Sequence, residues 1–485
     1  MSAYLDHAAT AGMSAAALAA YDAAATVVGN PSSLHANGRA ARNIVEDARE
    51  SIAANLGAHP TEVVFTSGGT ESNNLAIKGI YWAQTAQHPQ RNTLLISAME
   101  HHSVLAPARW LEKHGANLKI LPVTSQGQVQ PETLNTCLHT TISVDARSAF
   151  ASAPEQDNPV IAQPALVGEN LVILRPRAAG SAESRQLVAL VSVLLASNEI
   201  GTIEPIRELS ELAHSAGAPM HTDAVAALGQ IPISFAELGV DALSVAAHKI
   251  GGPHGVGALL VKRGLAIEPL HHGGDHERGL RAGTINVPGV AAFAAALSEA
   301  TANLTKNQTH QTWLREQLIK GVQTQILTAI LTGPPSATPA TSAVQPSLLG
   351  AQRSPSSRAQ QPPSSCAQQP PSSCAQQPPS SCAQSQDLVN PNLGNRLPGN
   401  ASFVFPGTDP DALLFGLDNA GFAASIGAAC AAGVAQASGA LLACGFSDAD
   451  ARLSLRFTLG PSTTEQEVEQ LVRILPAIVA AASLH

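Results

Sequence analysis

Short apolar runs alternate along the chain with longer stretches in which apolar residues recur every three or four positions. A short apolar run between turn residues indicates a buried strand, and the longer spacing indicates a helix with one apolar face. In the N-terminal half this pattern predicts strands at 62–66, 94–97, 118–123, 187–196, 218–221 and 243–247, and helices from residue 14 and at 38–56, 103–114 and 205–216. Such alternation predicts an α/β fold with a mostly parallel sheet and helices on both faces.

The C-terminal part of the chain has fewer strands. Strands are predicted at 400–405 and 451–458, and helices at 409–420 and 464–482. This pattern is typical of a smaller α+β domain. A long helical stretch, 289–327, leads to it.

Two segments interrupt these patterns. Residues 140–186 are rich in Ala, Pro and Ser and have weak periodicity, apart from a possible strand at 170–174. Residues 333–397 contain the octapeptide Ala-Gln-Gln-Pro-Pro-Ser-Ser-Cys three times. A repeat this rich in proline cannot bury a core, so we expect it to be disordered. We expect 140–186 to be an insertion at the surface.

The domain organisation follows from these boundaries. We expect an N-terminal arm at 1–13, a large domain at 14–262 that contains the insertion 140–186, and a small domain at 263–485 that contains the repeat 333–397. Turn chemistry at 29–35 separates the first two helices, and Ser33 or Asn37 is the expected N-cap of the second.

Composition narrows the functional classes. With 485 residues, 45% hydrophobic and 13% charged, the chain can form a large globular core. A net charge of −9 and the lack of a Lys/Arg cluster argue against direct nucleic-acid binding. No apolar run has transmembrane length, and the chain does not start with a basic and then an apolar segment. We therefore expect a cytoplasmic protein without a membrane partner. The six cysteines form no CxxC pair, so neither a disulfide framework nor a zinc site is indicated.

The apolar run 243–247 ends in His248 and Lys249, followed by a glycine-rich turn. Open α/β sheets bind ligands at the carboxyl ends of their strands. A lysine there can form a Schiff base with an aldehyde cofactor such as pyridoxal phosphate (PLP). Many lysines after a strand are simply solvated, so this stretch alone leaves both interpretations open.

Three other strand ends carry groups that suit such a cofactor. Ser67-Gly-Gly-Thr70 lies between a strand and a helix, where backbone N–H groups can bind a phosphate. His101 follows the strand at 94–97 and can stack on an aromatic ring or move protons. Asp223 can keep a pyridine nitrogen protonated. Taken singly, each has a simpler explanation: an ordinary tight turn, a solvated histidine, which is the usual case at a loop start, and a capping aspartate, which is the more common role.

Arg456 and Cys430 lie in the C-terminal part. Arg456 alternates with apolar residues in a predicted strand and can bind a substrate carboxylate, unless it is an ordinary surface arginine. Cys430 lies among small residues, which leave a thiol accessible, although a buried cysteine in such a setting is the more common case.

Together these motifs resemble the cysteine desulfurases of the NifS/IscS type, which are class-V aminotransferase-like enzymes with the fold-type I architecture of PLP-dependent transferases. The resemblance runs in order along the chain, outside 140–186 and 333–397. The matching stretches are YLDHAAT (4–10), GNPSSLHANGRAAR (29–42), EVVFTSGGTESNNLAIKG (62–79), EHHSVL (100–105), NEIGT (198–202), HTDAVAALGQIPI (221–233), GVDALSVAAHKIGGPHGVGALLV (239–261), HERGLRAGTINVPG (276–289), SIGAACAAG (425–433) and LSLRFTLG (453–460).

The resemblance implies a role for each matching residue. Lys249 forms the Schiff base with PLP, His101 stacks on the ring, Asp223 pairs with the ring nitrogen, and Asn198 lies near ring and substrate. The expected phosphate ligands are Gly69, Thr70 and His248, together with Thr284 from the neighbouring subunit of a homodimer. The substrate carboxylate is expected on Arg456 and Asn30, and Cys430 is the expected nucleophile.

The function that the resemblance implies is conversion of L-cysteine to L-alanine. Lys249 removes the α-proton, and the Cys430 thiolate takes the sulfur as a persulfide and transfers it to an acceptor protein. Iron–sulfur cluster assembly or tRNA thiolation would use that sulfur. The resemblance implies no resident metal, only a transient contact of Cys430 with an iron–sulfur cluster.

Four alanines depart from the family pattern. Ala226 replaces a glutamine that bonds the PLP phenolic oxygen, and Ala246 replaces a serine that contacts the phosphate. Ala282 and Ala429 replace serines before Gly283 and Cys430. Each lost cofactor hydrogen bond weakens PLP binding by about 1 kcal/mol. Two alternatives remain open: a selenocysteine lyase, which shares these motifs, and a non-catalytic homologue that acts as a sulfur-carrier scaffold.

Overall fold

The computed structural model describes residues 3–139, 187–335, 394–426 and 437–484. The expected insertion 140–186, most of the repeat 333–397, and Ala429 and Cys430 lie outside these residues. None of the helices in the described ranges is long and apolar enough to span a bilayer.

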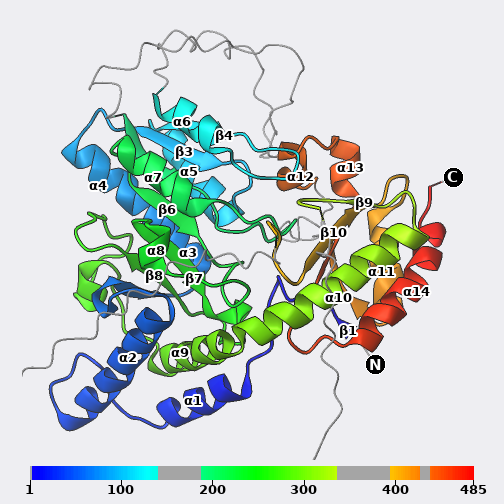
Figure 1. The fold of residues 1–485 in the computed structure, drawn as a ribbon. Coiled ribbons are helices and arrows are strands. Elements are labelled where there is room, and N and C mark those ends of the chain that lie inside the picture. The colour runs from blue at the N-terminus through cyan, green and yellow to red at the C-terminus, as the bar shows by residue number, and fades with distance from the viewer. Residues whose placement is uncertain (1–2, 140–186, 336–393, 427–436, 485) are drawn as a thin grey trace, which may run out of the picture.

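A seven-stranded sheet forms the main body of the molecule (Figure 1). Its strands, in spatial order, are β2 (Val63–Thr66), β8 (Gly257–Val261), β7 (Ala242–Ala246), β6 (Met220–Asp223), β5 (Val188–Ser192), β3 (Thr93–Ser97) and β4 (Asn117–Leu121). The five strands from β7 to β4 are parallel. The strand β8 lies between β2 and β7 and is antiparallel to both. Therefore β2 runs in the same direction as β7 and the other parallel strands. The predicted mostly parallel α/β sheet is confirmed.

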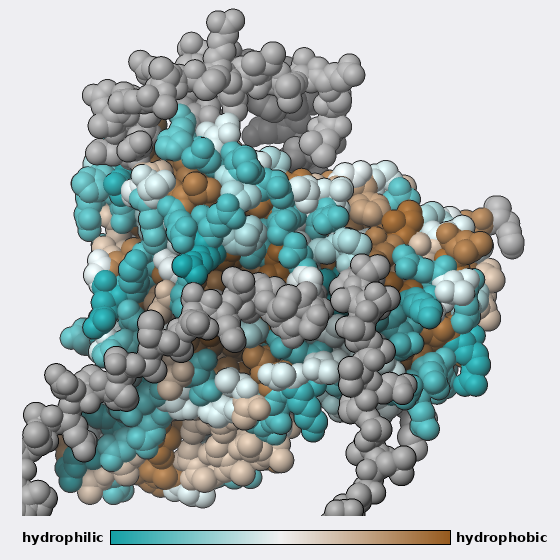
Figure 2. Space-filling view, viewed as in Figure 1, coloured by the Kyte–Doolittle hydropathy of each residue, from teal (hydrophilic) through white to brown (hydrophobic). Residues whose placement is uncertain are grey.

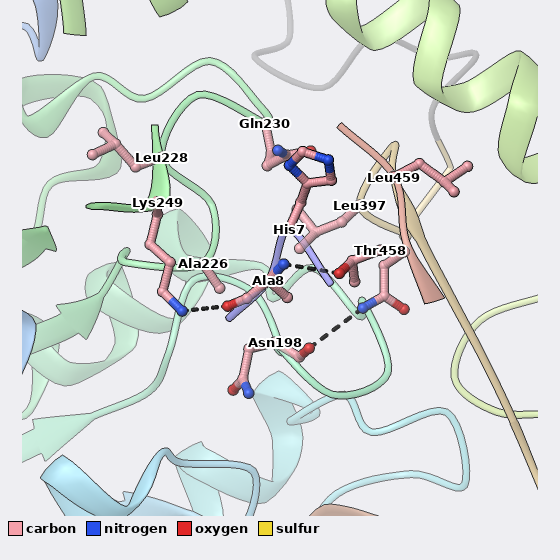
Figure 3. A pocket seen from close by; sticks show the side chains of 12 residues that line it. His7, Ala8, Asn198, Ala226, Leu228, Gln230, Lys249, Leu397, Thr458 and Leu459 are labelled. Atoms are coloured by element: carbon pink, nitrogen blue, oxygen red, sulfur yellow. Dashed lines mark hydrogen bonds between the residues drawn. The ribbon is translucent and has the colours of Figure 1, made fainter. Parts of the chain in front are cut away.

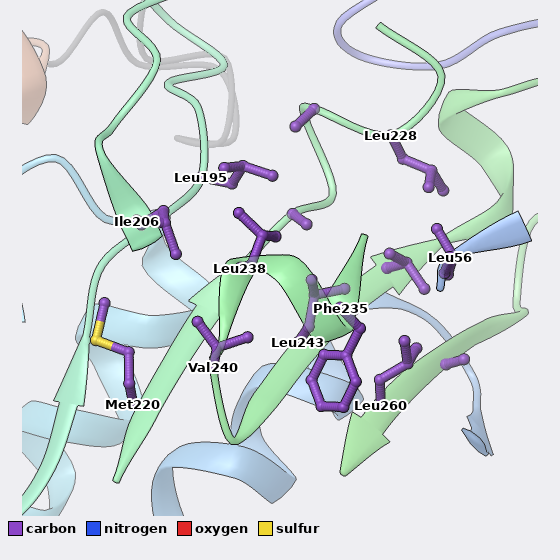
Figure 4. Packing of buried hydrophobic residues seen from close by; sticks show 14 of the residues in the cluster. Leu56, Leu195, Ile206, Met220, Leu228, Phe235, Leu238, Val240, Leu243 and Leu260 are labelled. Carbon is purple, nitrogen blue, oxygen red and sulfur yellow. The ribbon is translucent and has the colours of Figure 1, made fainter. Parts of the chain in front are cut away.

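Successive residues of a strand face opposite sides of a sheet, so each strand contributes to two cores. Leu95, Leu243 and Leu260 belong to one apolar cluster, and their neighbours Leu94 and Leu259 belong to the other. Figure 4 shows the first cluster, in which the short helix α8 (Phe235–Leu238) packs against the strands. The helices over this face are α2 (Ala36–Asn55), α6 (Pro131–His139), α7 (Ile206–Ser215) and α9 (Val287–Ala302).

The opposite face is covered by one continuous helical stretch and by α5 (His102–Lys113). The stretch comprises α3 (Gly69–Asn74), a π-helical turn (Leu75–Gly79) and α4 (Ile80–Gln87). The helix α3 begins shortly after β2 ends, and α5 begins shortly after β3 ends. This geometry brings their N-terminal residues to the same edge of the sheet.

A second, four-stranded antiparallel sheet carries the C-terminal part. Its strands are β12 (Ser425–Ile426), β13 (Ser454–Thr458), β10 (Asn400–Val404) and β9 (Ile330–Leu331), in spatial order. The helices α10 (Leu304–Gln325), α11 (Pro410–Asn419) and α14 (Glu465–Ala481) enclose its apolar cluster. Two short helices, α12 (Gly439–Ala443) and α13 (Asp448–Arg452), precede β13.

Residues 3–5 pack against this second unit and do not form a separate arm. The strand β1 (Ala3–Tyr4) pairs in parallel with β11 (Phe422–Ala423). Leu5 is fully buried in the same apolar cluster as Phe403 and Phe457. Residues 3–5 of the arm expected at 1–13 are therefore part of the packed structure.

The domain boundary expected at residue 262 also differs from the packing. Val290, Phe293 and Leu297 on α9 lie in the core of the large sheet, and α9 packs along α1 (Ala15–Ala25) and α2. The helical stretch expected at 289–327 is divided at Asn303, which ends α9 and precedes α10. The change from one core to the other occurs at this break.

The boundaries expected for the repeat were too wide at both ends. Arg396 is almost completely buried, and its guanidinium donates to the carbonyls of Ile200, Pro334 and Asn400. Leu397 packs into the core of the large sheet. The residues on both sides of the repeat are polar or glycine and show no apolar pattern. The sequence therefore gives no sign that they are ordered, and the predicted insertion includes them.

Other element ends also shifted. His35 caps α2 by accepting the Gly38 N–H, so neither Ser33 nor Asn37 is the cap. The strand expected at 187–196 ends at Ser192, and residues 451–452 of the strand expected at 451–458 belong to α13.

On the face shown in Figure 2, polar residues predominate and the apolar ones form separate groups.

A buried ion pair joins α2 to the segment after the main sheet. Arg49 donates to both carboxylate oxygens of Glu277, at 2.9 and 2.7 Å, and Glu277 also accepts the Phe65 N–H at 2.7 Å. Glu277 has a positive φ of 48°, which is unusual for a residue with a side chain. The ion pair and the strand contact hold this strained turn in place.

We predict that Glu277→Gln lowers the free energy of unfolding by about 3–5 kcal/mol, because it leaves the Arg49 charge buried without its inner partner. Urea denaturation followed by tryptophan fluorescence measures the change. The control is Glu211→Gln, which removes the partner of Arg207 in an exposed pair and should change stability by less than about 1 kcal/mol. Equal effects of the two substitutions would contradict the prediction.

Candidate active site

The carboxyl edge of the main sheet gathers most of the predicted site residues. Asp223 is the last residue of β6, and Lys249 lies three residues after β7. His101 lies between β3 and α5, and Gly69 begins the helix after β2. These four strands run in the same direction, so their ends meet at one edge.

Lys249 reaches across this edge to the N-terminal segment. Its Nζ donates to the Ala8 carbonyl and, at 3.1 Å, to the Ala9 carbonyl. On the other side of the segment, the Ala8 N–H donates to Thr458 Oγ1 of β13 at 2.8 Å (Figure 3). A pocket between the two sheets is lined by Lys249, Asn198 and Ala226. The N-terminal segment thus forms one wall of the space around the lysine amine.

Asp223 is buried and held by neutral donors. Its Oδ2 accepts from Asn73 Nδ2 at 2.7 Å, and its Oδ1 accepts the Val225 N–H at 2.9 Å. Both bonds fix the plane of the carboxylate. A fixed, buried carboxylate at a strand end suits a protonated ring nitrogen.

His101 is the N-cap residue of α5. Its Nδ1 accepts the Ser103 N–H at 3.1 Å and lies 2.7 Å from Ser103 Oγ. Burial lowers the pKa of His101, Asp223 raises it, and the charge of Lys249 lowers it further. The net shift is downward, so the imidazole is neutral at physiological pH.

The segment Ser67-Gly-Gly-Thr70 leaves the first helical N–H groups available. Gly68 precedes α3 with φ 142° and offers no side-chain cap. A Cβ on Gly69 would lie 2.7 Å from Val225 Cγ2, so a larger residue does not fit there without a shift. The N-terminus of the continuous helix 69–87 is therefore open to an anion.

His248 lies beside Lys249 and stacks against His254, with ring centroids 5.6 Å apart. Burial and the neighbouring charge of Lys249 lower the pKa of His248 to about 4. The ring is neutral at physiological pH, so it can donate a hydrogen bond to a phosphate but carries no charge.

Arg456 is buried on β13, and it contacts Asn198, which lines this pocket. Its Nη1 donates to the Asn198 carbonyl at 3.1 Å, and its Nη2 forms an ion pair with Asp6 Oδ1 at 2.8 Å. Its Nε is buried without a hydrogen-bond partner among the described residues. Arg456 is therefore not an ordinary surface arginine.

Two predicted residues lie apart from this group. Asn30 is exposed in the turn before α2, where its Oδ1 accepts the Ser32 N–H, and Thr284 is exposed. In the part of the chain that the structure describes, neither is hydrogen-bonded to Lys249, Asp223 or Arg456. Cys430 lies outside the described residues.

Comparison with known proteins agrees with this geometry. The model of the family "Aminotransferase class-V" matches residues 3–150 and 179–348. The "IscS-like cysteine desulfurase" of Mycobacterium tuberculosis is 38% identical over 99% of this chain and 97% of its own length. The chain is a class-V aminotransferase-like cysteine desulfurase of the NifS/IscS type.

Further relatives support the same family. The "Cysteine desulfurase IscS" of Dictyoglomus turgidum is 34% identical to this desulfurase over 93% of the chain and 87% of its own length. A solved structure described as a "NIFS-LIKE PROTEIN" superposes with a TM-score of 0.71 and 26% identity, covering 99% of the chain and 100% of its own length. The enzyme is therefore PLP-dependent.

The donor set of the desulfurase fits PLP. An amine lies beside the sheet edge at Lys249, a fixed carboxylate at Asp223, a neutral imidazole at His101, and open N–H groups at Gly69 and Thr70. Ala226 and Ala246 contribute no polar side-chain atom. The described residues hold no group of three or more His, Cys, Asp or Glu side chains arranged for a metal.

Sequence reasoning missed three carboxylates around this site. Asp6 pairs with Arg456, and its place in the YLDHAAT stretch gave the only hint. Glu199 is half-buried and accepts a hydrogen bond from Ser438 Oγ; desolvation raises its pKa, although Ser438 and Arg456 act to lower it. Burial, and then the charge of Asp223, raise the pKa of Glu100 well above its ordinary value.

We predict that Ala226→Gln strengthens PLP binding, because it restores a donor to the wall beside Lys249. One added hydrogen bond of about 1 kcal/mol corresponds to roughly a fivefold lower Kd. Titration of the apoenzyme with PLP measures it. Ala226→Met is the matched control, since Met has a similar length and no amide. If the Met variant gained as much affinity as the Gln variant, the added hydrogen bond would not be the cause.

Proposed function

We propose that this enzyme removes sulfur from L-cysteine, releases L-alanine and carries the sulfur as a persulfide on Cys430. The observation that carries the proposal is the link between Arg456 and Asn198. Arg456 holds the Asn198 carbonyl, and the Asn198 side chain lines the same pocket as Lys249. The guanidinium of Arg456 thus contacts the wall of the pocket that Lys249 lines, and an α-amino acid substrate needs both a cation for its carboxylate and an amine nearby.

Each residue has a defined task in this scheme. Arg456, with Asn30, holds the substrate carboxylate and so orients the Cα–H bond. Lys249 Nζ accepts the Cα proton. Asp223 keeps the ring nitrogen protonated, and Asn198 lies beside ring and substrate. When PLP is bound, its ring takes up the negative charge that develops at Cα. Gly69, Thr70 and His248 hold its phosphate.

Sulfur transfer needs a second nucleophile. The Cys430 thiolate attacks the substrate sulfur, an S–S bond forms, the substrate C–S bond breaks, and its electrons go to the carbon that becomes the alanine methyl group. The persulfide sulfur then passes to an acceptor protein for iron–sulfur cluster assembly or tRNA thiolation. Cys430 contacts such a cluster only in transit.

The working form is a homodimer in the cytoplasm. Thr284 is exposed and lies in the stretch that the family resemblance assigns to the neighbouring subunit's phosphate site. Its exposure in the single chain supports this assignment, because a residue that binds the phosphate of the neighbouring subunit must lie on the surface of its own subunit. The polar surface and acidic net charge favour protein partners over nucleic acid.

A second candidate is the non-catalytic sulfur-carrier scaffold. It is favoured by one observation, the alanines at 226 and 246, which remove polar groups beside the amine and the phosphate site. The complete set of Lys249, Asp223, His101 and Arg456 supports the catalytic proposal more strongly.

We predict sulfide release from L-cysteine in the presence of PLP and dithiothreitol. Lys249→Ala and Cys430→Ala should each lower the rate by about 100-fold or more, because each removes a reacting group. The matched control is Cys444→Ala. Cys444 is buried, and burial raises its thiol pKa to about 12, so its loss should leave the rate nearly unchanged.

An inactive parent that still binds PLP would contradict the catalytic proposal and favour the scaffold. Turnover of selenocysteine without turnover of cysteine would favour the lyase. Full activity of Cys430→Ala would exclude Cys430 as the sulfur carrier.

A further inference from the structure

A chain of hydrogen bonds connects Asp223 to His101 behind the site. Asn73 on α3 donates from Nδ2 to Asp223 Oδ2 at 2.7 Å and to Ser103 Oγ at 2.8 Å. Ser103 Oγ lies 2.7 Å from His101 Nδ1. Asn73 and Ser103 are buried, so the chain is shielded from solvent. It joins the two residues that are expected to touch the PLP ring.

The orientation of Asn73 is fixed by its neighbours. The carboxylate of Asp223 can only accept, so the amide nitrogen and not the amide oxygen must face it. The second N–H then points to Ser103. Asn73 Oδ1 is left buried without a partner among the described residues. A buried acceptor without a partner is unfavourable, which shows that the two donated bonds decide the orientation.

The remaining protons follow from this orientation. Ser103 Oγ accepts from Asn73, so its single hydrogen is available for His101 Nδ1. The Ser103 backbone N–H, which can only donate, also points at Nδ1 from 3.1 Å. Nδ1 therefore carries a lone pair, and in the neutral ring the proton lies on Nε2.

We propose that Asn73 and Ser103 are positioning residues that couple Asp223 to His101 and hold His101 as the Nε2–H tautomer. The proposal rests on the proposed function, which brings His101 and Asp223 into contact with PLP. A ring in this state offers an N–H donor at Nε2 and does not act as a base there. The Cα proton must then go to Lys249.

The charges around His101 are consistent with this state. Among the described residues, the titratable groups that act on it include Asp223, Lys249 and His102. Burial and Lys249 disfavour the doubly protonated ring, and protonation at Nδ1 would also break both bonds from Ser103. The negative charge of Asp223 favours the doubly protonated ring. The hydrogen bond from Asn73 spreads part of the Asp223 charge into the hydrogen-bond chain.

The first test is the tautomer itself, measured by NMR of the apoprotein with ¹⁵N-labelled histidine, the His101 signals being assigned by difference with His101→Gln. We expect Nε2 protonated and Nδ1 unprotonated at pH 7–8. A proton on Nδ1 would overturn the inference. This result does not depend on turnover, so an inactive parent would refute the proposed function alone.

The second test is a double-mutant cycle on the holoenzyme. Asn73→Ala and Ser103→Ala should each lower kcat roughly tenfold and leave KM within about twofold, and each should shift the pH midpoint of the visible absorbance of lysine-bound PLP. Because the residues act as one chain, the double variant should be little worse than either single variant. Additive losses would overturn the coupling.

Three further variants separate coupling from structural damage. Ser103→Thr keeps the hydroxyl and should restore the absorbance midpoint. Asn74→Ala changes the half-buried neighbour of Asn73, whose Nδ2 donates locally to the Thr70 carbonyl at 3.0 Å, and should leave the midpoint unchanged. Ser192→Ala removes another buried serine–imidazole bond, 2.9 Å to His221 Nδ1, and should lower stability without moving the midpoint. A shift in either control would overturn the assignment.

Discussion

The common direction of β2, β3, β5, β6 and β7 is the constraint on which the site depends. A parallel strand must end at the same edge as its neighbours, and a helix then returns the chain to the other edge. Residues far apart in sequence, such as Gly69, His101, Asp223 and Lys249, are therefore brought together by backbone pairing. Side-chain contacts only refine what the sheet has arranged.

The N-terminal segment connects the two units at this edge. Leu5 anchors it in the smaller core, Asp6 holds Arg456, and the Ala8 carbonyl accepts from Lys249. The arginine expected to bind the substrate and the lysine expected to react with it thus share one short support. A buried guanidinium needs such a partner, because an unpaired charge at this depth is strongly unfavourable.

The sequence predicted the elements that depend on local pattern. The strand before Lys249 is clear from its apolar run. The strand expected at 218–221 is Met220–Asp223 in the structure, because its polar residues give no apolar run to mark its end. The links among side chains were not predictable, because Asn73, Ser103 and Asp6 acquire partners only through tertiary packing. Arg396 was missed for the opposite reason: its polar surroundings resemble a linker, although its guanidinium is buried among carbonyls. The break at Asn303 has no proline or glycine to mark it.

The central claim is that the sheet edge presents Lys249 to the aldehyde of PLP. Borohydride reduction of the PLP-loaded enzyme fixes the cofactor to the lysine that holds it, and peptide mapping by mass spectrometry then identifies that lysine. The account predicts a single stoichiometric label on Lys249, absent in Lys249→Ala. A label on another lysine, such as Lys262 or Lys78, or no label in a protein that binds PLP, would contradict it.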